Sequence, residues 1–90
     1  MNDFKLIRRI RLGSAHRSTG RTRHYRGLEE LPRPSELRIV QYEGDSGFYL
    51  LYCDGMAREF TDTYHENIER AMSQAEWEFS VKPDEWETGG

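Results

Sequence analysis

The spacing of apolar and polar residues predicts three strands in the C-terminal part of this 90-residue chain. Apolar and β-branched residues concentrate in three short segments, Leu37 to Tyr42, Phe48 to Cys53 and Arg58 to Thr61. Glycine, aspartate and serine between the first two favour a turn, and Asp54-Gly55 favours a tight hairpin. The pattern therefore predicts an antiparallel sheet of three strands.

The segment after the third strand has the periodicity of an amphipathic helix. Thr63 and Glu66 match the S/T-x-x-E capping box, so the helix is predicted to begin just after Thr63. Residues 35–90 are therefore predicted to be α+β, with the three-stranded sheet packed on one C-terminal α-helix. The apolar stripe, at about 3.6 residues per turn, consists of Ile68, Ala71, Met72, Ala75 and Phe79.

The middle strand, residues 48–53, is apolar on both faces. A strand covered by a single helix normally alternates apolar and polar residues, because successive side chains point to opposite faces. Burying each large side chain contributes about 1.5–3 kcal/mol, so the second face needs a cover: the N-terminal segment, a second copy of the chain, or a protein partner. The predicted pairing places Glu59 on this second face and Phe60 on the face toward the helix. The candidate interface residues of the second face are Phe48, Leu50 and Tyr52.

Residues 4–12 fit two interpretations. Phe4, Leu6 and Ile10 contribute to a strand-like alternation, whereas Phe4, Ile7 and Ile10 also fit a helical stripe. We favour a strand, because five apolar residues in nine can cover a sheet face or extend its edge.

The stretch from Gly13 to Gly27 consists mostly of glycine, serine, threonine, arginine and histidine. Such a composition buries too little apolar area to offset the entropy of ordering, which predicts a mobile linker. The chain is therefore divided into a basic, largely flexible segment at residues 1–34 and a small acidic βββα-type domain at residues 35–90.

The net charge of −3 is unevenly distributed. Residues 1–30 carry +5 and residues 31–90 carry −8. Arginine outnumbers lysine eleven to two, which suits phosphate recognition but also follows from a GC-rich genome. Nucleic-acid association through the N-terminal segment is therefore the alternative function. Its candidate anion-binding residues are Arg8, Arg9, Arg11, Arg17, Arg21, Arg23 and Arg26.

Trp77 is predicted on the side of the helix opposite the apolar stripe, because it lies nine positions after Ile68. A tryptophan in water exposes a large apolar area. Either the tail from Val81 to Trp86 folds back over it, which we favour, or both tryptophans belong to an interface. Trp77 and Trp86 therefore join the candidate interface residues.

Candidate catalytic and metal-binding residues are few. His65 and Glu69 lie one helical turn apart, but a zinc site needs three or four converging ligands. Cys53 is the only cysteine and lies within an apolar strand, where a thiol is usually a small buried hydrophobe. We therefore predict a protein that is not an enzyme and that has no metal and no cofactor.

The lone cysteine also indicates a reducing compartment. The first twelve residues interleave basic with apolar side chains, so they lack the apolar core of an export signal. The sequence contains no run of about 18 apolar residues, so it predicts no membrane span. The expected localisation is cytoplasmic.

Three segments, FYLLYCD at residues 48–54, TDTYHE at residues 61–66 and QAEWEF at residues 74–79, continue into Val81, Pro83, Glu85 and Trp86. This succession resembles a group of small uncharacterised bacterial proteins with an FYLxYxD…TDTxH…QAExEF…VxPxEW pattern. The resemblance covers residues 37–87. It implies a bacterial origin and a small α+β fold, and it implies no activity.

The sequence as a whole favours a non-enzymatic protein–protein interaction module. The apolar second face predicts either a protein partner or a homodimer, and the acidic flank of the helix suits a basic partner.

Overall fold

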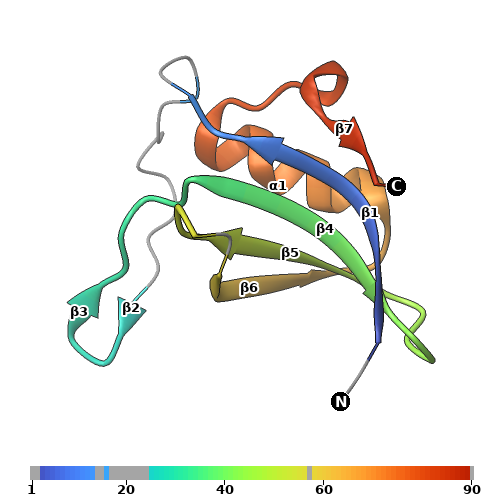
Figure 1. The fold of residues 1–90 in the computed structure, drawn as a ribbon, viewed down its shortest axis with the longest axis horizontal. Helices are drawn as coiled ribbons and strands as arrows, with labels where there is room; N and C mark the ends of the chain where they lie inside the picture. Colours follow the sequence, from blue (N-terminus) through green and yellow to red (C-terminus); the bar gives the residue numbers. More distant parts are fainter. Residues whose placement is uncertain (1–2, 14–15, 17–24, 57, 90) are drawn as a thin grey trace.

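The computed structural model describes residues 3–13, 16, 25–56 and 58–89. A five-stranded antiparallel sheet packs against one α-helix (Figure 1). The elements along the chain are β1 (Phe4–Arg11), β2 (Tyr25–Arg26), β3 (Glu29–Glu30), β4 (Glu36–Tyr42), β5 (Phe48–Cys53), β6 (Glu59–His65), α1 (Ile68–Phe79), the short 3₁₀ helix η1 (Pro83–Glu85) and β7 (Glu87–Thr88).

The predicted α+β class with one C-terminal helix is confirmed, but the sheet is larger than the three predicted strands. Its order is β6-β5-β4-β1-β7. The strand favoured for residues 4–12 is present as β1, which pairs with β4 so that Leu6 lies opposite Val40 and Ile10 opposite Leu37. The N-terminal segment thus contributes a full strand of the sheet, next to β4. The short strand β7, which the sequence did not predict, pairs with the outer edge of β1.

The helix covers the face of β5 that was predicted to need another cover. Leu50 and Tyr52 are fully buried and pack with Ala71, Ala75 and Phe79 of α1. Phe48 packs against the edge of the same cluster. The prediction that these three β5 residues need a cover other than the helix is therefore wrong, because they are the floor of the core beneath α1.

A β-bulge in β6 explains why the sequence analysis assigned the wrong face of β5 to the helix. Tyr52 pairs with Thr61 and Cys53 with Glu59, so Phe60 is the additional residue on β6. A bulge shifts the alternation of side chains on its strand. Phe60 therefore packs against the core beneath α1, and Glu59 pairs across from Cys53 on the opposite face. We call the sheet face opposite α1 the open face.

The helix begins later than predicted. β6 continues through Thr63 to His65, and Asn67 caps α1 by accepting a hydrogen bond from the Arg70 amide at 2.8 Å. Thr63 instead hydrogen-bonds His65 across 2.7 Å. The predicted capping box is wrong because the Thr63 backbone is needed in the sheet.

Replacing Asn67 by alanine should lower the free energy of unfolding by about 1 kcal/mol, since the Arg70 amide then loses its side-chain acceptor. Glu66→Ala is the matched control, with an expected change within about 0.5 kcal/mol. Urea denaturation followed by circular dichroism measures both. A larger loss for Glu66→Ala than for Asn67→Ala would contradict the observed cap.

The C-terminal tail folds onto the helix-side core and leaves Trp77 outside it. Val81 is fully buried, and Trp86 packs against the same cluster as Leu50. Trp77 remains 42% exposed on α1. The fold-back over Trp77 is therefore wrong, because Trp86 packs against the core beneath α1 instead.

Candidate functional site

Four aromatic side chains form a continuous row across the open face. Phe4, Tyr42, Tyr49 and Tyr64 come from β1, β4, β5 and β6, four neighbouring strands. Successive rings meet edge to face, with centroid separations of 5.7, 5.3 and 5.2 Å. Such contacts add about 0.5–1.5 kcal/mol per pair beyond burial. We call these four residues the aromatic row.

The strand register brings these rings together. Phe4 lies opposite Tyr42, and Tyr49 lies opposite Tyr64. Tyr42 and Tyr49 are diagonal neighbours, a separation that aromatic side chains span. The ends of the row remain accessible, because Phe4 is 50% and Tyr64 52% exposed.

The turn between β4 and β5 fixes the Tyr64 end of the row. Gly47 is buried beneath the Tyr64 ring, and a Cβ atom at position 47 would lie 2.1 Å from the Tyr64 hydroxyl. Asp45 accepts a hydrogen bond from the Gly47 amide at 2.9 Å and one from the Tyr49 hydroxyl at 3.4 Å. The absence of a side chain at Gly47 therefore leaves the space that the Tyr64 ring occupies.

Carboxylates surround the aromatic row. The pKa of the Tyr42 hydroxyl is raised by partial burial and then by the nearby charges of Glu59 and Asp62. The pKa of Tyr49 is raised by desolvation and by Asp45. The pKa of Glu59 is itself raised, by desolvation and by its neighbour Asp62. Carboxylates on the open face therefore disfavour ionisation of these tyrosines.

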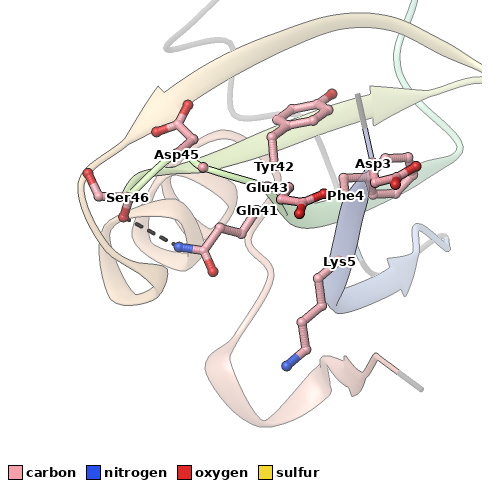
Figure 2. Close-up of a pocket in the computed structure, with 9 residues that line it drawn as sticks. Asp3, Phe4, Lys5, Gln41, Tyr42, Glu43, Asp45 and Ser46 are labelled. Carbon is pink, nitrogen blue, oxygen red and sulfur yellow. Dashed lines mark hydrogen bonds between the residues drawn. The ribbon is translucent and has the colours of Figure 1, made fainter. Parts of the chain in front are cut away.

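Two open hollows border the β4–β5 turn. One, of about 550 Å³, is lined by Phe4, Tyr42 and Asp45 together with Asp3, Lys5, Gln41, Glu43, Gly44 and Ser46. Figure 2 shows its aromatic and carboxylate side chains. The other, of about 560 Å³, is lined by the turn with Tyr42 and Tyr49. The aromatic row therefore borders concave surface with mixed aromatic and acidic character.

The apolar residues beneath the row form a second small cluster. Val40, Leu51 and Cys53 are buried on the open face, with Leu6, Tyr42 and Tyr49 packed against them. Burial raises the pKa of the Cys53 thiol to about 11. A thiol that stays protonated at neutral pH is a poor nucleophile, so Cys53 supports the sheet rather than chemistry.

The predicted anion-binding arginines that the structure describes contact carboxylates or backbone. Arg9 lies 3.2 Å from Glu87, Arg11 lies 3.8 Å from Glu36, and Arg8 donates to the Ile7 carbonyl at 2.9 Å. Arg17, Arg21 and Arg23 lie outside the described residues, as does the side chain of Arg26.

One residue of the predicted linker is buried. His16 accepts a hydrogen bond from the Gly13 amide through Nδ1 at 2.9 Å, and its Nε2 lies 2.8 Å from Glu85. The pKa of Glu85 is lowered, first by the Lys82 amide and then by His16. These two bonds place His16 against η1, and the mobility expected for the linker stays a prediction. Residues 14–15 and 17–24 of that linker lie outside the described part of the chain.

A buried polar group lies beneath α1. Glu78, only 2% exposed, accepts hydrogen bonds from the Tyr52 hydroxyl and from the Gln74 amide. Burial and the bond to Glu78 raise the pKa of Tyr52 far above its ordinary value. Because both groups are enclosed, this contact holds the helix on β5. Among the described residues, no group of three or more histidine, cysteine, aspartate or glutamate side chains is arranged to hold a metal ion.

Sequence reasoning missed the aromatic row. Each ring lies on a different strand, and only the register brings them into contact. The usable signal was one aromatic residue at the start of β1 and β5, Phe4 and Tyr49, and one at the end of β4 and β6, Tyr42 and Tyr64, since antiparallel pairing brings these ends together.

Comparisons with known proteins give no relative for this chain: no family model, curated protein or solved structure matches it. The resemblance to small bacterial proteins therefore stays a prediction. The described part of the chain contains no helix of the length and apolarity needed to cross a membrane.

Proposed function

We propose that this protein is a non-enzymatic protein–protein interaction module whose binding surface is the open face of the sheet. The observation that supports it is the aromatic row, which crosses four strands on the face that α1 does not cover. Tyrosine and phenylalanine are enriched at protein interfaces because they bury large areas at low entropic cost.

Charge decides which partner suits this surface. The negative charges of Asp45, Glu59 and Asp62 contribute to the raised pKa values of Tyr42 and Tyr49. A nucleic-acid backbone would be repelled here, whereas an arginine or lysine would gain both a carboxylate and an aromatic face. The partner is therefore a protein segment with basic side chains.

An NMR titration of the full chain with tetra-arginine amide at low salt tests this proposal. We expect the ring resonances of Tyr42, Tyr49 and Tyr64 to shift, and the shifts to weaken as salt is added. Tyr42→Leu should reduce the affinity several-fold, because Tyr42 contacts both Phe4 and Tyr49. Leu28→Ala is the control, since Leu28 is fully exposed elsewhere.

The result that would overturn the proposal is equally specific. A single-stranded oligonucleotide that shifts these rings while tetra-arginine amide does not would favour the nucleic-acid alternative. Ring resonances unmoved by tetra-arginine amide at low salt would reject the open face as a surface for basic segments.

A further inference from the structure

β6 forms one edge of the sheet. Among the described elements its sheet neighbour is β5, whereas the opposite edge, at β1, is partly paired with β7 (Figure 1). In an antiparallel strand, backbone N–H and C=O groups point alternately to the two sides, so every second residue of β6 directs these groups outward. Such an edge is a template for another extended segment.

Two different surfaces border this edge. On the open face lie Glu59, Asp62 and Tyr64, the last ring of the aromatic row. On the helix side, a hollow of about 400 Å³ lies between the end of β6 and α1. A strand added to β6 would direct alternate side chains to these two surfaces. The hollow is lined by His65, Arg70, Ser73, Gln74 and Trp77.

The helix provides most of the lining of this hollow. Its four α1 residues, from Arg70 to Trp77, recur at i, i+3, i+4 and i+7 and so form one stripe of the helix. Trp77 provides the apolar surface of that stripe and is 42% exposed. A guest side chain in the hollow would therefore contact an indole ring and meet the positive charge of Arg70.

The charges beside β6 determine which partner side chains suit the open-face side and which suit the helix side. β6 carries Glu59 and Asp62 and contains no lysine or arginine. Basic side chains therefore fit the open-face side, next to these carboxylates and Tyr64. On the helix side Arg70 disfavours a second cation, and Trp77 favours an apolar group. The matching sequence alternates basic and apolar residues.

The same charges disfavour a second copy of this chain. Pairing β6 with β6 of another molecule would bring the carboxylates of both strands to one edge without a lysine or arginine on either strand. Like charges across adjacent strands destabilise the pair. A second copy of this chain therefore suits the β6 edge less well than a basic partner segment does.

We propose that β6 binds an extended partner segment as an additional strand, with basic side chains over Asp62 and Tyr64 and apolar side chains in the hollow beside Trp77. The inference rests on the proposed function, because it specifies how the same basic partner docks. Strand addition supplies main-chain hydrogen bonds, and the two bordering surfaces supply the selectivity.

The test uses a capped seven-residue peptide of alternating arginine and valine, in three forms. One is unmodified, one is N-methylated at the valines and one at the arginines. N-methylation removes the backbone donors along one edge of a strand and leaves all charges in place. We expect one methylated form to bind at least tenfold more weakly and the other within threefold of the parent. The measurement is isothermal titration of the full chain.

Hydrogen exchange and two variants locate the peptide. Amides of β6 at alternate positions should become protected in the complex. Asp62→Asn and Trp77→Ala should each weaken binding about three- to tenfold, whereas Asp84→Asn, on exposed η1, should not. Light scattering should show a monomer before the peptide is added.

The outcomes separate this proposal from the proposed function. If both methylated peptides bind like the parent and only the open-face rings shift, strand addition is rejected and the interaction surface stands. If neither the alternating peptide nor tetra-arginine amide binds, both proposals fail. A concentration-dependent dimer with β6 amides already protected would show that a second copy occupies the edge.

Discussion

Leu50→Ala should lower the free energy of unfolding by about 2–5 kcal/mol, the range for removing a large aliphatic side chain from a packed core. Leu50 is fully buried between β5 and α1. Its removal leaves a cavity that the rigid sheet cannot fill. A loss of this size is a large part of the roughly 5–15 kcal/mol that stabilises a small domain.

Urea denaturation of purified protein measures this loss, with Leu28→Ala as the control. Leu28 is fully exposed in the loop between β2 and β3, so its truncation should change stability by less than about 0.5 kcal/mol. A cost below about 1 kcal/mol for Leu50→Ala would contradict its place beneath α1. Such a small cost would instead indicate that Leu50 lies at the surface.

Stability should fall by up to about 3 kcal/mol between pH 9 and pH 11. Burial raises the pKa of the Cys53 thiol from its ordinary 9.0 to about 11, and each pKa unit corresponds to about 1.4 kcal/mol. The folded state keeps this proton where the unfolded state loses it. The contribution of the Cys53 thiol to stability is therefore fully present below pH 9 and is lost as pH rises toward 11.

Tyr52 extends the decline above pH 10, because burial and its hydrogen bond to Glu78 also raise its pKa. Urea midpoints from pH 7 to pH 11 measure the slope. Cys53→Ala should flatten the curve between pH 9 and pH 10, and Tyr52→Phe should flatten it above pH 10, whatever each costs at pH 7. A wild-type midpoint unchanged from pH 8 to pH 11 would contradict the buried, protonated state of both groups.

Local patterns were sufficient for much of the fold. The stripe with Ala71, Ala75 and Phe79 predicted the buried side of α1, and these three residues are indeed buried. The alternation around Leu6 and Ile10 favoured a strand, and that strand is β1. Both signals depend only on the repeat of one element, which the sequence records directly.

Features that depend on two segments were beyond these patterns. The bulge at Phe60 changes which side chains of β6 share a face with Leu50 and Tyr52, and a single inserted residue leaves no periodic signal. Thr63 satisfied a capping motif, but pairing with Leu50 kept it in the sheet. The aromatic row required the register of four strands at once.

The amino-acid sequence alone determined that this protein is a small α+β domain with an apolar surplus on β5, because burial periodicity is written along each element. The tertiary structure decided which face of β5 the helix covers, where Trp86 packs, and that Phe4, Tyr42, Tyr49 and Tyr64 meet. These outcomes depend on register and bulges, and the energies that select a register arise only when separate strands are already in contact.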